Sequence, residues 1–398
     1  MIIKSIKNQH SSSKEVNWYE RNPSLDGLRG VLALTVCFTH AWAAIIAPWL
    51  GGFNLLHGMF SIPARLAVVS FFVLSGYAIC VSVQQNIKKY SEFSLYDWGL
   101  NRVLRIYPPL IVSVVICLLL IQITQLIDYE SVTPYPLARG VFNYDMDVVL
   151  KSLISIGFEG RLTGSVYSGF NGPMWSLAIE MQLYVLVGLL VVILRGALIL
   201  KIIFSFVLFY LIKYEVLSAF ESSLVKLGYL SFAMGYIASR FRGEILIFSK
   251  DLLMIVGGGV MLIAICILMN EFLNDYNYLR ELNSLESIGI QLVYSIGFSI
   301  ILVSIKGKVA KLFANKWVSQ TGRFSYTLYI IHFPLLVVLA SIVFLMIDFT
   351  NMHMVLWLVW ALSIIFVVFV AYYIARFVEN PKTQKAWLMK TVASILSK

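Results

Sequence analysis

An arginine and a histidine share one face of an expected helix near the N-terminus. Residues 24–40 begin Ser-Leu-Asp-Gly-Leu-Arg-Gly and continue through apolar and small residues to His40. Arg29 and His40 are eleven residues apart, which is three helical turns plus about 20°, so both side chains lie on one face about 16 Å apart along the axis. Because a neutral imidazole accepts protons near pH 7 and is costly to place in an apolar span, His40 is predicted to be catalytic. The alternative is a structural hydrogen bond to a neighbouring helix.

Two more arginines are predicted at the inner end of an apolar span. Arg102 and Arg105 are three residues apart, a spacing that puts both guanidiniums on one helix face. Two forked donors suit a phosphate, and Arg29 is expected at the same depth. The three arginines together predict a site for a multiply phosphorylated cytoplasmic ligand, with Asp26 lining it. The alternative is ordinary anchoring of the span at the inner membrane face.

A polar stripe crosses another span. Ser176, Glu180 and Tyr184 recur at every fourth position, so they share a face. We expect Glu180 about 10 Å below the outer surface and His40 about 16 Å above the inner one, depths that nearly meet in a core of about 30 Å. Glu180 is therefore predicted to assist catalysis, with His40 or a substrate hydroxyl as its partner, whereas the alternative is a purely structural ion pair.

A second histidine lies in a later span. His332 shares a helix face with Ser325 and Tyr329, and Pro334 follows as a predicted kink. His332 and Tyr329 are expected either to line the site or to make structural hydrogen bonds between helices. No pair of cysteines has the spacing of metal ligands, so we expect no metal site.

The composition indicates that membrane-spanning helices position these residues. Hydrophobic residues make up 59% of the 398 positions and charged residues 13%, which a soluble domain of this size could not accommodate. We predict an all-α polytopic bundle in which residues 1–24 are a cytoplasmic segment, 25–376 the membrane domain and 377–398 a cytoplasmic tail. About ten spans are expected, at 31–50, 62–83, 103–123, 173–194, 197–213, 223–239, 251–270, 286–305, 325–347 and 354–375.

The basic residues predict the orientation of the bundle. With both termini inside, 24 of the 31 lysines and arginines fall on the inner side or at inner span ends, as the positive-inside rule requires. The net charge of +10 is explained by this topology, so no nucleic-acid partner is expected.

Five sequence segments in this order resemble the acyltransferase 3 family of membrane O-acyltransferases, over nearly the whole chain. These segments are Leu25–Gly30 with His40, Phe71–Tyr77, Arg102–Pro108, Trp175–Leu177 with Glu180, and Ser325–Tyr326 with His332. The second departs from the expected form, because Val69 and Ser70 precede Phe71 where an acidic residue often stands.

The resemblance implies an acyl-CoA donor, most simply acetyl-CoA, and no permanently bound cofactor. It implies a multi-pass protein of the inner (cytoplasmic) membrane whose acceptor is a hydroxyl of a cell-surface glycan such as O-antigen or exopolysaccharide. Arg29, Arg102 and Arg105 would hold the CoA phosphates, and His40 would act as base or acyl relay, oriented by Glu180. Some members carry a further extracytoplasmic domain, so we expect glycan-assembly proteins or a second copy as partners besides the lipid bilayer.

A transporter or flippase of a glycan or lipid-linked sugar is the competing interpretation, because it too would carry buried charges around a central cavity. A flippase does not require the three arginines at the inner face. Their presence therefore favours the acyltransferase.

Overall fold

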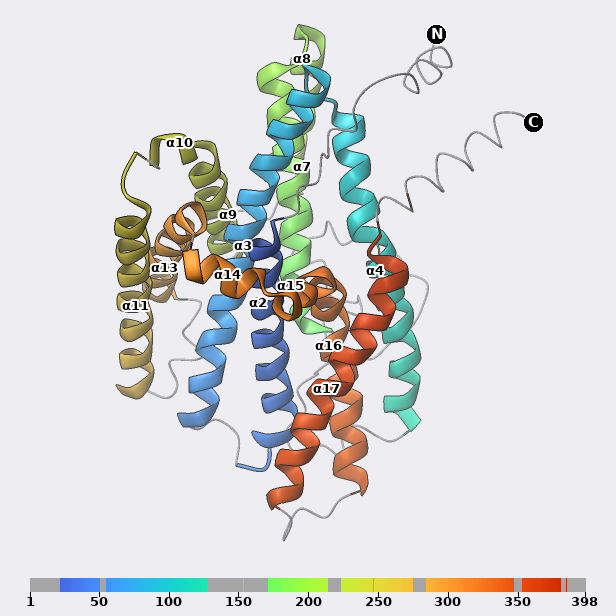
Figure 1. Cartoon of the computed structure of the whole chain (residues 1–398). Coiled ribbons are helices and arrows are strands. Elements are labelled where there is room, and N and C mark those ends of the chain that lie inside the picture. The colour runs from blue at the N-terminus through green and yellow to red at the C-terminus, as the bar shows by residue number, and fades with distance from the viewer. Residues whose placement is uncertain are drawn as a thin grey trace, which may run out of the picture.

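The computed structural model is a bundle of helices (Figure 1). It describes residues 22–50, 55–126, 153, 171–213, 223–245, 247–274, 284–305, 307–346, 353–380 and 384, and these contain no strand. The predicted tails, 1–24 and 377–398, lie almost entirely outside the described residues. The all-α fold class is confirmed.

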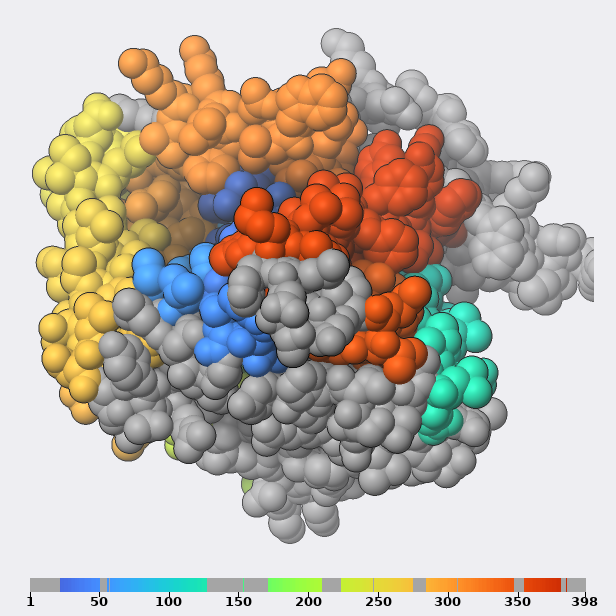
Figure 2. All heavy atoms as spheres, turned by 90° about the horizontal axis from the view of Figure 1, so that it is seen from below, coloured from blue at the N-terminus to red at the C-terminus, as the bar shows by residue number. Residues whose placement is uncertain are grey.

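Eight of the described helical segments are long and apolar enough to cross a membrane. They are α2 (Pro23–Ala41) with η2 (Trp42–Ile46), α3 (Leu55–Tyr90), α4 (Leu95–Leu126), η3 (Gly172–Met174) with α7 (Trp175–Arg195), α11 (Lys250–Asn274), α13 (Leu285–Ser304), α16 (Ser325–Met346) and α17 (His353–Val378). Seen from the lower end of Figure 1, blue atoms of α2 and α3 lie between the yellow atoms of α11 and the red atoms of α16 and α17 (Figure 2).

The other two predicted spans are also helices. They are α8 (Leu198–Lys213) and α9 (Ser223–Arg240). Helix α8 is shorter than the eight spans named above, and polar residues interrupt α9. Neither helix therefore reaches the length and hydropathy of those eight. The count of ten spans and the inward position of both termini stay predictions. The short helix α10 (Arg242–Ile245) follows α9.

Glycines allow two pairs of helices to cross closely. A Cβ on Gly76 of α3 would lie 1.9 Å from the carbonyl oxygen of Phe232, and one on Gly235 of α9 would lie 1.9 Å from that of Val73. Small residues permit such contacts in membranes, where packing rather than water exclusion holds helices together. Gly257 allows the same close approach of α11 to α13, because a Cβ there would lie 2.8 Å from the carbonyl oxygen of Gly297.

Two short helices lie across the first span. These are α14 (Gly307–Ala314) and α15 (Lys316–Arg323), which run across α2 in Figure 1. The glycines beside Arg29 make this contact possible, because a Cβ on Gly27 or Gly30 would stand 1.9 Å from an atom of α14 or α15. The space at Gly30 is therefore filled by Thr321 and does not hold a ligand.

Candidate functional site

The two predicted histidines of the membrane domain meet in the bundle. His40 Nδ1 lies 2.8 Å from His332 Nε2, although 292 positions separate them in the chain. The ring centroids are 5.1 Å apart and the ring planes differ by 19°. His332 is 1% exposed, whereas His40 keeps part of its surface open. Of the two histidines, His40 is therefore the more exposed residue and His332 the more enclosed.

The backbone around His332 is anchored through a carbonyl that Pro334 releases. Pro334 has no N–H, so the carbonyl of Ile330, four residues earlier, lacks its helical donor. Ser113 Oγ of α4 and Asn171 Nδ2 each donate to this oxygen at 2.8 Å. The proline thus converts a helical hydrogen bond into two contacts that tie α16 to its neighbours.

A carboxylate that directly follows the last span caps the start of α16. Glu379 Oε1 accepts hydrogen bonds from Thr327 N at 2.7 Å and Thr327 Oγ1 at 2.5 Å. The first N–H groups of a helix have no partner within it, and a negative charge at this end also suits the helix dipole. Glu379 therefore fixes the N-terminal end of the helix that carries His332.

Glu180 accepts hydrogen bonds from two hydroxyl groups. Ser75 Oγ of α3 donates to Glu180 Oε1 at 2.6 Å, and Tyr184, one turn along α7, donates to the same oxygen. The sequence analysis gave His40 or a substrate hydroxyl as the partner of Glu180. The structure instead pairs His40 with His332, because α16 brings a second imidazole to within 2.8 Å of it. His332, and not Glu180, is therefore the residue in hydrogen-bonding contact with the His40 ring.

Three arginines lie near Glu180 or Tyr184 of α7. Arg29 lies within electrostatic range of Glu180, Asp26 and Arg105, and the hydroxyl of Tyr184 lies near both Arg105 and Arg102. Arg102 is 9% exposed and donates from Nη2 to Ser82 Oγ at 3.1 Å. We call Arg29, Arg102, Arg105, Glu180, Tyr184 and Ser75 the polar cluster. Its three arginines outnumber the two nearby carboxylates, Glu180 and Asp26, so the site has a net positive charge suited to an anion.

Tyr329 lies between the polar cluster and the histidine pair. Its hydroxyl is 2.6 Å from Ser176 Oγ and donates to the carbonyl of Pro173 at 3.0 Å. Its ring centroid lies 5.8 Å from that of His332, and it is within electrostatic range of Glu180. The predicted stripe on α7 is therefore divided: Ser176 contacts Tyr329, while Glu180 and Tyr184 contact each other.

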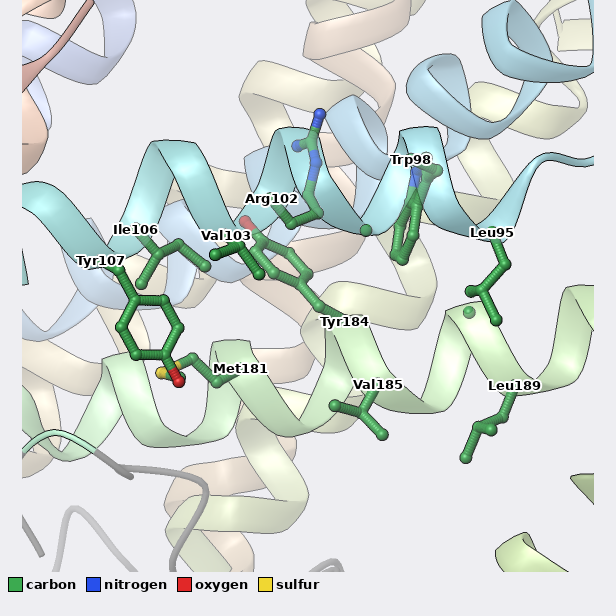
Figure 3. Close-up of a pocket in the computed structure, with 12 residues that line it drawn as sticks. Leu95, Trp98, Arg102, Val103, Ile106, Tyr107, Met181, Tyr184, Val185 and Leu189 are labelled. Atoms are coloured by element: carbon green, nitrogen blue, oxygen red, sulfur yellow. The ribbon is translucent and has the colours of Figure 1, made fainter. Parts of the chain in front are cut away.

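A groove of about 280 Å³ opens beside the cluster, between α4 and α7. Its walls are mostly apolar, and Gly99 and Gly188 contribute no side chain to them. Figure 3 shows the Tyr184 ring reaching from α7 toward α4, while the Arg102 guanidinium extends away from α7. The groove is thus a mostly apolar space that lies directly beside the polar cluster.

Three functional contacts were absent from the sequence analysis. Ser75 lies within a segment that was recognised, but nothing indicated its contact with Glu180. Asn171 precedes a proline-containing turn, which marks a helix start but no partner. Glu379 directly follows the last span and stands two residues before Pro381, a signal only that the helix ends there.

One comparison with known proteins identifies the chain. The family model Acyl_transf_3, described as an acyltransferase domain, matches residues 22–376. No curated protein and no solved structure matches the chain. Among the residues that the structure describes, no group of three or more His, Cys, Asp or Glu side chains could hold a metal ion.

Proposed function

Because the chain belongs to the acyltransferase 3 family of membrane acyltransferases, we propose that it is an O-acetyltransferase acting on glycans. It would move an acetyl group from cytoplasmic acetyl-CoA to a hydroxyl of a cell-surface or lipid-linked glycan. The inner (cytoplasmic) membrane is the location this reaction requires. Glycan-assembly proteins or a second copy of the chain are the partners that would deliver the acceptor.

The polar cluster supports an anionic donor. CoA carries several phosphate groups, and Arg29, Arg102 and Arg105 offer forked donors for them. Arg29 and Arg105 keep part of their surface exposed, so a ligand can reach them. In this assignment the thioester lies toward His40, which stands eleven residues beyond Arg29 on the same helix.

The observation that carries the proposal is the contact between His40 and a second, buried histidine, in which His40 Nδ1 lies 2.8 Å from His332 Nε2. As a general base, His40 takes the proton of the acceptor hydroxyl while that oxygen attacks the thioester carbonyl. The intermediate then expels CoA as a thiolate, which takes the proton back from His40, so the products are an ester and free CoA. In the alternative route His40 takes the acyl group first and passes it to the hydroxyl.

The reaction is tested by supplying radiolabelled acetyl-CoA to membranes that contain the protein and analysing the glycan fraction by mass spectrometry. We expect an acetyl group on the glycan that is absent from membranes without the protein. A flippase would leave glycan mass unchanged and alter only its distribution between the membrane faces. That result would overturn the proposed reaction.

The role of His40 is tested by two substitutions. His40→Ala and His40→Gln should both abolish transfer while CoA binding persists, because Gln keeps hydrogen-bonding capacity but exchanges no proton near pH 7. Thr35→Val is the matched control, since Thr35 Oγ1 donates only to Val31 O of its own helix. Substantial transfer by well-folded His40→Gln would contradict the catalytic assignment.

A further inference from the structure

We propose that His332 is a positioning residue that selects the tautomer of His40 and leaves His40 Nε2 as the proton acceptor. This inference rests on the proposed function, because it concerns the base of that reaction. It goes further in assigning a chemical role to a second histidine and in naming the reactive atom of the first.

The argument begins at the enclosed end of the pair. His332 Nδ1 lies 2.7 Å from the carbonyl oxygen of Tyr329 and 3.1 Å from that of Leu328. Carbonyl oxygens only accept hydrogen bonds, so Nδ1 must carry the proton. In a neutral imidazole the other nitrogen then has a free lone pair, and His332 Nε2 is therefore an acceptor.

The lone pair of His332 determines the protonation of His40. His332 Nε2 is 2.8 Å from His40 Nδ1, so His40 Nδ1 must donate and carries the proton. The nitrogens are closer than the centroids, at 2.8 Å against 5.1 Å, and the planes differ by 19°, so the rings meet edge to edge with the lone pair in the ring plane. His40 Nε2 is left unprotonated, as a general base requires.

The burial of His332 favours the neutral form on which this argument depends. His332 is 1% exposed, and its ring neighbours are those of His40, Tyr329 and Phe333. A doubly protonated ring there would place a charge inside the membrane without a carboxylate in hydrogen-bonding contact among the residues that the structure describes, which is costly. When His40 becomes positively charged during catalysis, its Nδ1–H still donates to His332, so His332 holds the tautomer and orientation of the ring, which is one of the two roles of the aspartate in a Ser-His-Asp triad.

The tautomer can be measured without any enzymatic activity. Protein labelled with ¹⁵N-histidine is studied in lipid bilayers by solid-state NMR, and the signals of His40 are assigned by their loss in His40→Gln. We expect a protonated Nδ1 and an unprotonated Nε2 in the native protein. A spectrum with a protonated His40 Nε2 would overturn the inference and leave the acyltransferase activity untouched.

Substitutions at His332 give the second test. His332→Leu removes the acceptor, so His40 should populate both tautomers and kcat should fall about tenfold to a hundredfold, a part of the roughly 10²–10⁴-fold that a general base supplies. His332→Gln can accept from His40 Nδ1 through its amide oxygen and should retain most of kcat. The KM for acetyl-CoA should change in neither variant, because the arginines are intact.

Phe333→Leu is the control for packing, because the Phe333 ring lies 5.2 Å from that of His40 and has no polar atom. It should lower thermal stability while leaving the His40 tautomer and kcat close to those of the native protein. If His332→Leu keeps full kcat and an unchanged tautomer while His40→Gln is inactive, only the inference about His332 is overturned. If His40→Gln remains active, the proposed base is wrong, and the NMR measurement still decides whether His332 selects the tautomer.

Discussion

The carbonyl of Ile330 should couple the energies of two side chains, Ser113 and Asn171, because both donate a hydrogen bond to it. It accepts from Ser113 Oγ and from Asn171 Nδ2, both at 2.8 Å, and Ile330 is fully buried. Ser113→Ala or Asn171→Ala alone leaves one donor in place. Each should cost about 0.6 kcal/mol, the average for a hydrogen bond between membrane helices.

The double substitution leaves the buried carbonyl without a donor. An unsatisfied buried group costs about 1–3 kcal/mol, so the double variant should exceed the sum of the single variants by about 1 kcal/mol. Pro334→Ala restores an N–H four residues after Ile330, which then donates along the helix. In that background the excess should disappear.

The assay is reversible unfolding in mixed micelles titrated with a denaturing detergent, read as free energies for the complete set of variants. Ser341→Ala is the control, because its Oγ donates to the carbonyl of Val337, which has a helical donor of its own. It should add the same small cost in both backgrounds. Costs for Ser113→Ala and Asn171→Ala that add to within about 0.5 kcal/mol, or an excess that persists in Pro334→Ala, would refute the reasoning.

Three further predictions follow from the arginines, the helix crossings and the topology. Arg102→Ala and Arg105→Ala should each weaken CoA binding about tenfold to a hundredfold, because a charge-assisted contact contributes about 1.5–3 kcal/mol. Substitution of the exposed Arg240 by Ala should leave CoA binding unchanged. Equal affinities by calorimetry would show that Arg102 and Arg105 only anchor the span at the membrane face. Gly76→Ala, whose Cβ would meet Phe232 O at 1.9 Å, should unfold the protein or lower its melting temperature, whereas Gly258→Ala, with no atom within 4 Å, should not; equal melting temperatures would contradict the close crossing. Reporter fusions should show both termini inside. Fusions after Lys89, Arg242 and Lys316 should report the inside, and fusions near Arg139 and Tyr276 the outside. A reversed pattern would contradict the predicted depths of His40 and Glu180 in the membrane.

The sequence carries most of the information about the helices. Hydropathy alone locates every span that the structure describes, because a helix must present about 20 apolar residues to cross the hydrocarbon. Periodicity also shows which residues share a face, so the contact of Glu180 with Tyr184 one turn away follows from spacing. Of the ten predicted spans, only those that form α8 and α9 in the described residues fall short of the length or hydropathy of the other eight.

The partners across helices could not be predicted in the same way. Periodicity identifies the face of a helix but not the neighbour that covers it, and nothing local connects His40 with a residue 292 positions away. Depth in the membrane suggested Glu180 as the partner of His40. Depth alone could not identify the partner, because two residues at one depth need not lie at one position in the plane of the bilayer. The glycines beside Arg29 illustrate the same limit, since a small residue admits either a ligand or a helix, and α14 and α15 occupy the space.

The position of His332 depends on hydrogen bonds to the backbone of its helix. Apolar packing between membrane helices gives little directional preference, because lipid chains are as apolar as leucine. Helix α16 is instead held at its start by Glu379 and near its proline by Ser113 and Asn171, and these contacts are directional. His332 lies between these two attachments, two residues after Ile330 and five after Thr327. Losing either attachment should therefore shift the His332 imidazole relative to His40 without unfolding the bundle. Substitutions that remove one attachment should thus reduce acetyl transfer even where the protein stays folded.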